Sequence, residues 1–293
     1  MVAVGVDARR IGWTVVALGD GRFAGASRLL TLQDLLGGMP DVAAVAVNLP
    51  TVLLGQGVRQ CDGEVQMTLG TAGADIDLVP PRAAFETADF DLARQLSVER
   101  SGPEPSERMH ALRGKVLELQ QFARDLARHS QSVMGWANQR IGEPYAISSA
   151  KGGHRARWAK RLNSPEGMRR LARVIRPGRR ARPRRQTGRM DARVAGPVVE
   201  GNAELSFRQL RGRALSYPPD CAQGTMERAR LLREAGIVVP AELGEVGGVP
   251  VAELLDAAAL AWTAFRYQRG LAVSVPPRQR WQREGDHIVA IWA

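Results

Sequence analysis

Four apolar runs near the N-terminus restrict this chain to a mixed β-sheet. The runs are VAVGVD at 2–7, WTVVALGD at 13–20, FAGASRLL at 23–30 and AAVAVNLP at 43–50. Asp20-Gly21 is typical of a hairpin turn, so the first three runs are predicted to form an antiparallel meander. A short helix predicted over 31–39 separates the third run from the fourth. A helical connection of this kind favours a right-handed crossover that places the fourth strand parallel to the first.

The rest of the chain supplies helices to cover such a sheet. Residues 51–90 are rich in Gly, Pro, Asp and Arg and predict a loop with short helices. A fifth strand is predicted in GPVVEGN at 196–202, and a terminal strand or strand-like tail in HIVAIWA at 287–293. Helical spacing is found at roughly 107–137, 203–212, 225–236 and 251–270. In the last of these helices we expect one apolar stripe, made of Val251, Leu254, Leu255, Ala258, Trp262 and Phe265. The expected fold class is therefore α/β.

The positive charge of the chain is concentrated in one segment. The formal net charge is +11, but residues 151–193 contain 16 Lys or Arg and two acids, so the remainder is close to neutral. We predict a single domain over 1–293 that carries a basic, flexible insertion at 151–193. Such a segment favours a nucleic-acid partner through phosphate contacts. An Arg-loaded loop of biased composition, or one packed on acids elsewhere, is the alternative. Trp158 is its one aromatic residue, which disfavours dedicated single-strand recognition.

The expected compartment follows from the cysteines and from the absence of long apolar segments. Only Cys61 and Cys221 are present, which gives no disulfide framework and no paired metal-ligand spacing. No stretch approaches 18 consecutive apolar residues, and the N-terminus runs directly into a strand. The sequence thus predicts a cytoplasmic protein without a membrane partner.

Four polar residues occupy positions that packing alone would fill with apolar side chains. Asp7 and Asn48 end the first and fourth strands, Glu204 begins a helix after the fifth strand, and Asp256 lies in an Ala-rich helix. Carboxylates at one sheet edge can converge on a divalent cation, and two such ions about 4 Å apart would activate water for phosphodiester hydrolysis. In the alternative, Asp7 only ends a strand, Glu204 is an ordinary first-turn acid, and Asp256 pairs with an Arg.

A series of sequence blocks resembles the domain of unknown function 429 family, which is predicted to contain nucleases of ribonuclease H-like fold. The blocks follow family order and are GVDARRIGW at 5–13, VAVNLPTVL at 45–53, RQCDGEVQMTLG at 59–70, PPRAAFE at 80–86, VVEGNAELSF at 198–207, ELLDAAALAWTAFRYQRGLA at 253–272 and IVAIWA at 288–293. The resemblance implies a ribonuclease H-like sheet of an antiparallel meander plus parallel strands, flanked by helices.

The same resemblance implies that Asp7, Glu204 and Asp256 bind Mg²⁺ or Mn²⁺. Asn48 stands where the family usually has Asp; an amide can offer a carbonyl oxygen but no charge, so activity is expected to be impaired. Asn202-Ala203 also replaces the common His-Pro, and the basic segment is longer than the family linker.

Three residues in the family blocks after the fourth strand are weaker candidates for lining the cleft. Arg59, Asp62 and Arg82 could line the cleft, where an Arg would pair with a phosphate; the favoured alternative is a structural pair between Arg59 and Asp62.

Three functions remain open at this point. The first is a metal-dependent nuclease with Asp7, Asn48, Glu204 and Asp256 at its centre. The second is an inactive ribonuclease H-like protein that binds nucleic acid. The third is a small-molecule phosphotransferase, which ranks last because no Gly-rich phosphate loop is found. The sequence does not determine the oligomeric state.

Overall fold

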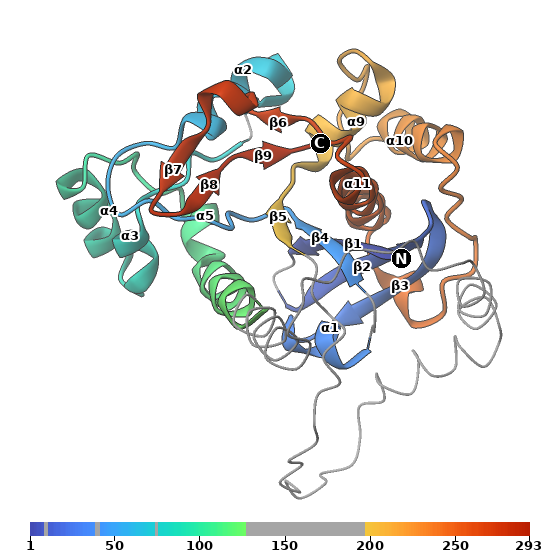
Figure 1. Ribbon diagram of the computed structural model, residues 1–293, viewed down its shortest axis with the longest axis horizontal. Helices are drawn as coiled ribbons and strands as arrows, with labels where there is room; N and C mark the ends of the chain where they lie inside the picture. Colours follow the sequence, from blue (N-terminus) through green and yellow to red (C-terminus); the bar gives the residue numbers. More distant parts are fainter. Residues whose placement is uncertain (9–10, 39–41, 74–75, 127–196) are drawn as a thin grey trace, which may run out of the picture.

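Five strands form one mixed sheet in the order β3-β2-β1-β4-β5 (Figure 1). In this computed structural model, which describes residues 1–8, 11–38, 42–73, 76–126 and 197–293, β1 pairs antiparallel with β2, and β2 with β3. Strand β4 lies parallel to β1 and to β5. The strands are β1 Val2–Ala8, β2 Trp13–Gly19, β3 Arg22–Leu29, β4 Val42–Val47 and β5 Val198–Glu200. The predicted mixed sheet, flanked by helices in a manner consistent with a ribonuclease H-like arrangement, is confirmed.

The helices fall where the sequence periodicity predicts them, with one interruption. Helix α5 ends at Ala111, and a second helix covers 113–126, so the helix expected from 107 is broken at Leu112. The predicted continuation to 137 and the basic insertion at 151–193 lie outside the described residues. The labelled helices are α1 Gln33–Gly38, α2 Gln60–Leu69, α3 Arg82–Glu86, α4 Phe90–Glu99, α5 Glu107–Ala111, α9 Ala203–Arg211, α10 Ala222–Glu234 and α11 Val251–Gln268, with 3-10 turns η1 Gly70–Gly73, η2 Gly244–Gly248 and η3 Arg278–Arg280.

The two faces of the sheet are packed with side chains of different size. One face presents larger residues, among them Val4, Val6 and Trp13, to the helix 113–126. The other presents small residues to α11, including Ala3 and Ala46. Small side chains shorten the distance between a helix and a sheet, so α11 lies closely against β1, as Figure 1 shows.

Helix α11 is buried over a wider surface than one apolar stripe. Ala257, Ala261 and Ala264 are fully buried, whereas Val251, which we expected to face the core, is 52% exposed. The expected stripe is therefore wrong in part: the sheet covers one side of α11, while α9 and α10 pack on other sides. An Ala-rich helix suits this position because it can approach several neighbours at once.

The C-terminal segment forms two small sheets rather than one terminal strand. Strand β6 (Ser274–Val275) pairs with β9 (Ile291–Trp292), and β7 (Gln282–Glu284) pairs with β8 (His287–Val289). A bridge between Gly201 and Trp292 attaches this region to the end of β5. No described helix has both the length and the apolar character needed to cross a membrane.

The close approach of α11 to β1 predicts that Gly5 tolerates no side chain. A Cβ atom there would lie 2.0 Å from the carbonyl oxygen of Ala257 and 2.1 Å from the amide nitrogen of Ala261. We expect Gly5→Ala to lower the free energy of unfolding in urea by about 3 kcal/mol or more, because the backbone of α11 must move. Gly25→Ala in β3 is the matched control, since no atom lies within 4 Å of its added Cβ. Equal losses in both variants would contradict close packing at Gly5.

Candidate active site at the sheet edge

Asp7 and Asn48 meet at the adjacent ends of β1 and β4, as the sequence predicts. The amide Nδ2 of Asn48 donates a hydrogen bond to Oδ1 of Asp7, and the backbone amide of Ala8 donates to Oδ1 of Asn48 at 2.9 Å. The Asn48 backbone amide also donates to the Val6 carbonyl at 3.3 Å, which continues the parallel ladder. Asp7 is only 4% exposed. Both polar ends of Asn48 are therefore used to hold the end of β1.

The carboxylate of Asp7 lies on the α11 side of the sheet. Side chains alternate along a strand, so Asp7 shares its face with Ala3 and Gly5. Ala3 belongs to the cluster that contains Leu260, and Gly5 faces Ala257, so β1 runs antiparallel to α11. Asp7 is thereby carried toward the N-terminal turns of α11, where Asp256 is found.

Glu204 begins α9 and is bound by a buried arginine. Asn202 caps this helix by accepting from the Leu205 amide at 2.9 Å. Arg228 of α10 donates from Nε and Nη2 to Oε1 of Glu204, at 3.1 and 2.5 Å. The Arg228 side chain is 1% exposed. Arg228 was not singled out from the sequence, where it is one of several arginines in an amphipathic helix.

Asp256 has one carboxylate oxygen that receives no hydrogen bond from the described residues. Its Oδ1 is buried and accepts no hydrogen bond within the described part of the chain. Burial is the main cause that raises the pKa of Asp256 to about 7, and the charges of Glu204 and Glu253 add to the rise. The positive charge of Arg228 acts in the opposite direction and lowers this pKa. The expected alternative, an ion pair between Asp256 and an arginine, is absent from the described part of the chain, where Arg228 binds Glu204 instead. Asp256 therefore shares one electrostatic environment with Glu204 and Glu253.

The chemistry of this edge fits a divalent cation held by few protein ligands. An unpartnered buried oxygen on Asp256 and the mutual repulsion of neighbouring carboxylates both favour a cation. Among the residues described, however, no three His, Cys, Asp or Glu side chains form a group that could hold a metal ion. Mg²⁺ is commonly bound by one or two carboxylates and several waters, so the arrangement is compatible with an open site.

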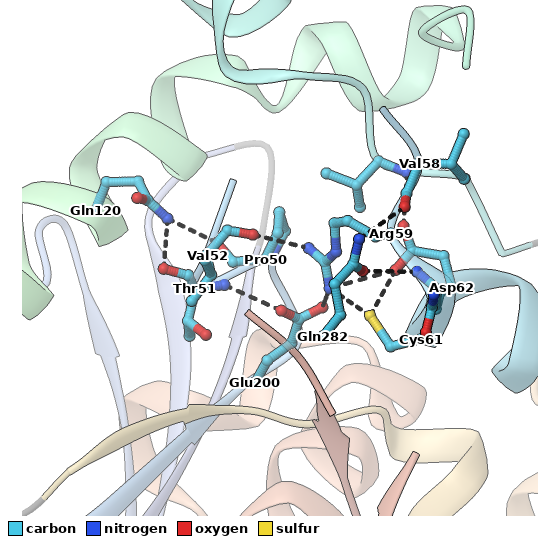
Figure 2. Close-up of polar contacts among 12 residues, drawn as sticks. Pro50, Thr51, Val52, Val58, Arg59, Cys61, Asp62, Gln120, Glu200 and Gln282 are labelled. Atoms are coloured by element: carbon cyan, nitrogen blue, oxygen red, sulfur yellow. Dashed lines mark hydrogen bonds and ion pairs between the residues drawn. The ribbon is translucent and has the colours of Figure 1, made fainter. Parts of the chain in front are cut away.

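A second polar cluster, centred on Arg59, lies beside the loop that follows β4 (Figure 2). The Nη2 atom of Arg59 lies 2.5 Å from Oε1 of Glu200, at the end of β5, and 3.2 Å from Oδ1 of Asp62 in α2. It also donates to Sγ of Cys61 at 3.2 Å. Arg59 is 1% exposed. The structural pair of Arg59 with Asp62 is thus formed, and Glu200 joins it.

Glu200 was missed by sequence reasoning, although a signal was present: it is the only acid in the apolar run VVEG. Its Oε2 accepts from the Thr51 amide at 3.1 Å, and burial outweighs Arg59 to raise the pKa of Glu200 to about 7. Gln120 donates to the carbonyls of Pro50 and Thr51 at 3.1 and 2.7 Å. These contacts fix the loop that leaves Asn48.

Arg82 is not tied to either cluster. It begins α3, and its backbone amide donates to the Leu54 carbonyl at 2.8 Å. Its side chain forms no hydrogen bond or ion pair with the described residues, so its predicted role in binding phosphate remains a prediction.

The raised pKa of Glu200 predicts that stability falls as pH rises. Below about pH 4.5 the carboxyl is protonated in folded and unfolded chains, but between pH 4.5 and 7 the unfolded chain loses the proton first. The contribution of Glu200 to the free energy of unfolding is therefore present at low pH and is lost as the pH rises to about 7. We expect Glu200→Gln to flatten the decline in unfolding free energy between pH 5 and 8. Glu86→Gln, at an exposed position in α3, should retain the wild-type slope. An unchanged slope in Glu200→Gln would contradict the assignment.

The Arg59 cluster also predicts that the stability of the fold depends strongly on the Arg59 guanidinium. Arg59→Met leaves Glu200 and Asp62 buried without their shared partner, so we expect unfolding free energy at pH 8 to fall by about 3 to 5 kcal/mol. Adding Glu200→Gln to Arg59→Met should recover part of this loss, because one uncompensated carboxylate is removed. Additive losses in the double variant, measured by urea denaturation, would show that the groups are not coupled.

Comparison with known proteins assigns the chain to a family without an assigned activity. A family model described as "Protein of unknown function (DUF429)" matches residues 5–137 and 148–280. No curated protein and no solved structure matches the chain. The matched segments include Asp7, Asn48, Glu204 and Asp256 as well as the Arg59 cluster. Since they cover well over half of the sequence, the chain belongs to the DUF429 family.

Proposed function

We propose that this protein is a metal-dependent nuclease whose cation site is weakened by Asn48. The observation that carries the proposal is the buried, unpartnered Oδ1 of Asp256 beside the charge of Glu204. A carboxylate oxygen excluded from water and given no donor is unfavourable unless a cation or a proton neutralises it. Its location, near the ends of parallel strands, is where α/β proteins commonly bind ligands.

Glu204 and Asp256 would hold Mg²⁺ or Mn²⁺ together with water, and Asp7, which accepts from Asn48, would act on the ion by its charge rather than complete a three-acid group. The carbonyl oxygen of Asn48 already accepts from the Ala8 amide, so its main effect is to orient the Asp7 carboxylate. When bound, a divalent cation supplies Lewis acidity that activates water and stabilises a leaving phosphate oxygen. Asp256 would add negative charge from the helix side, and Glu204 keeps Oε2 available after Oε1 binds Arg228.

A second candidate function is nucleic-acid binding without turnover. Asp7 receives the Asn48 amide, and Glu204 receives Arg228, so two of the three acids are compensated without a cation. A protein that had lost catalysis would be stable in this state. The 16 basic residues between Lys151 and Arg193 supply the charge needed to contact phosphates in either function.

Cleavage assays with RNA, DNA and hybrid substrates test the nuclease proposal. We expect cleavage by the full chain with Mn²⁺, loss of cleavage with EDTA, and loss in Asp256→Asn, because that variant removes a charged ligand. Asp89→Asn is the matched control: Asp89 caps α4 by accepting from the Leu92 amide, which Asn can also do. It should cleave as wild type does.

In the same cleavage assay, we expect higher activity from a variant with an acid at position 48. Asn48→Asp adds a carboxylate beside Asp7, and we expect Mn²⁺ affinity to rise about tenfold, equivalent to about 1.4 kcal/mol, and cleavage to rise with it. Asn48→Ala removes the amide without adding charge and should show no such gain. If no substrate is cut by wild type or Asn48→Asp while salt-sensitive binding persists, the nuclease proposal fails and the binding function is favoured.

A further inference from the structure

The end of α11 and the segment that follows it carry arginine and aromatic side chains and no acids. Between Ala257 and Arg283 the sequence has five arginines and four aromatic residues, and it has neither Asp nor Glu. The arginines are Arg266, Arg269, Arg278, Arg280 and Arg283, and the aromatic residues are Trp262, Phe265, Tyr267 and Trp281. This region is therefore positively charged without any contribution from the segment 151–193, where Trp158 is the one aromatic residue.

Aromatic rings from α11 and from the C-terminal strands form one connected group. Phe265, Tyr267 and Trp292 pack against the same buried cluster. The ring of Trp292 meets Tyr267 edge-on, with 4.7 Å between the centroids, and meets Trp281 at 5.8 Å. Nε1 of Trp281 also donates to Oγ of Ser274 at 2.9 Å, and Ser274 lies in β6, which pairs with β9. The rings are thus held in place by the fold.

Two arginines lie over rings of this group and have no acidic partner. The Arg269 guanidinium carbon lies 5.2 Å from the Phe265 ring centroid, and that of Arg278 lies 5.4 Å from the Trp281 ring centroid. Both arginines are exposed, and neither side chain forms an ion pair or hydrogen bond with the described residues. The residues connected by these contacts are named the arginine–aromatic surface: Phe265, Tyr267, Arg269, Arg278, Trp281 and Trp292.

We propose that the arginine–aromatic surface binds single-stranded nucleic acid, with phosphates at Arg269 and Arg278 and bases stacked on the exposed planar groups. Proteins that bind single strands combine positive charge along the phosphates with aromatic rings on which bases stack. A guanidinium that lies over a ring also offers its outer face to a base. A duplex keeps its bases inside, so it offers phosphates to this surface but no free base. The inference requires no metal ion and goes beyond the proposed function.

The structural alternative is that the arginines of this region only stabilise the end of α11. Cations near a helix C-terminus interact favourably with the helix dipole, and Arg266 has this role, since its Nη2 donates to the Leu271 carbonyl at 2.5 Å. Arg280 is also structural, because it binds both carboxylate oxygens of Glu64, at 2.9 and 3.0 Å. Arg278 lies outside α11 and has no such partner among the described residues, so stabilisation of the helix does not account for it.

The test is fluorescence anisotropy of the full-length protein with labelled oligothymidine, oligouridine and a DNA duplex of equal length, in EDTA so that no strand is cleaved. Wild type should bind the single strands at least about fivefold more tightly than the duplex, since stacking of one base contributes about 1 kcal/mol or more. Positive charge elsewhere in the chain favours the duplex, whose charge density is higher, and does not produce this preference. Comparison of oligothymidine with oligouridine establishes whether DNA or RNA binds more tightly.

Two substitutions of Trp281 separate the effect of its ring from that of its hydrogen bond. Trp281→Leu and Trp281→Phe both remove the donor to Ser274, but only Trp281→Phe keeps an aromatic ring. We expect Trp281→Leu to lose most of the preference for single strands and Trp281→Phe to keep most of it, with circular dichroism establishing that both variants are folded. Equal binding by the two folded variants, or no single-strand preference in wild type, overturns the inference.

Arg278 provides a test that leaves every ring in place. Arg278→Gln should weaken single-strand binding and lower the dependence of log affinity on log salt by about 0.7, whereas Arg278→Lys, which keeps the charge without the planar group, should weaken binding with that dependence unchanged. Arg100→Gln is the matched control, because Arg100 is exposed at the end of α4 and its side chain forms no ion pair or hydrogen bond with the described residues. It should bind as wild type does. Equal weakening in Arg100→Gln and Arg278→Gln, or unchanged affinity in Arg278→Lys, overturns the inference even if Trp281→Leu does not fold.

Discussion

The backbone contact between α11 and β1 is the constraint on which the arrangement of this site depends. Gly5 allows the helix to lie so close to the strand that an added Cβ would meet the carbonyl oxygen of Ala257 at 2.0 Å. Small residues around it, such as Ala3 and Ala46, extend the same close surface. Because the helix and strand are antiparallel, this contact fixes how far Asp256 lies along β1. The position of Asp256 is thus set by glycine and alanine residues that have no reactive side chains.

Buried charges need a partner of opposite charge or a hydrogen bond, and the clusters around Arg59 and Arg228 provide these partners in different ways. Around Arg59, two carboxylates share one guanidinium, and the cluster is closed to solvent, with Arg59 and Asp62 at 1% and 2% exposure. Around Arg228, the guanidinium binds Glu204, and Asp256 keeps an oxygen without a donor. A closed cluster stabilises one conformation of the loop after β4. Under the proposed function, the unsatisfied oxygen of Asp256 would meet the cation, whereas both carboxylate oxygens of Glu200 already accept hydrogen bonds.

The sequence predicts the sheet more fully than it predicts the site. The meander, the crossover and the parallel strands follow from apolar runs and one hairpin signal, and the meeting of Asp7 with Asn48 follows from strand order. Arg228 could not be identified in this way, because nothing in a helical pattern distinguishes an arginine that faces inward from one that faces solvent. The expected stripe on α11 was wrong in part for a related reason: periodicity describes a helix with one covered side, and α11 is covered on several.

Asn48 and Arg228 have the same effect on the electrostatics of the sheet edge, although they lie on different elements. Asn48 is neutral, so it adds no negative charge beside Asp7. Arg228 adds a permanent positive charge beside Glu204, so the net negative charge at this edge is smaller. Each residue compensates a carboxylate that folding brings into the protein: Asn48 donates to Asp7, and Arg228 binds Glu204. Under the proposed function, the two residues that stabilise the chain without a cation would also weaken its attraction for a dication.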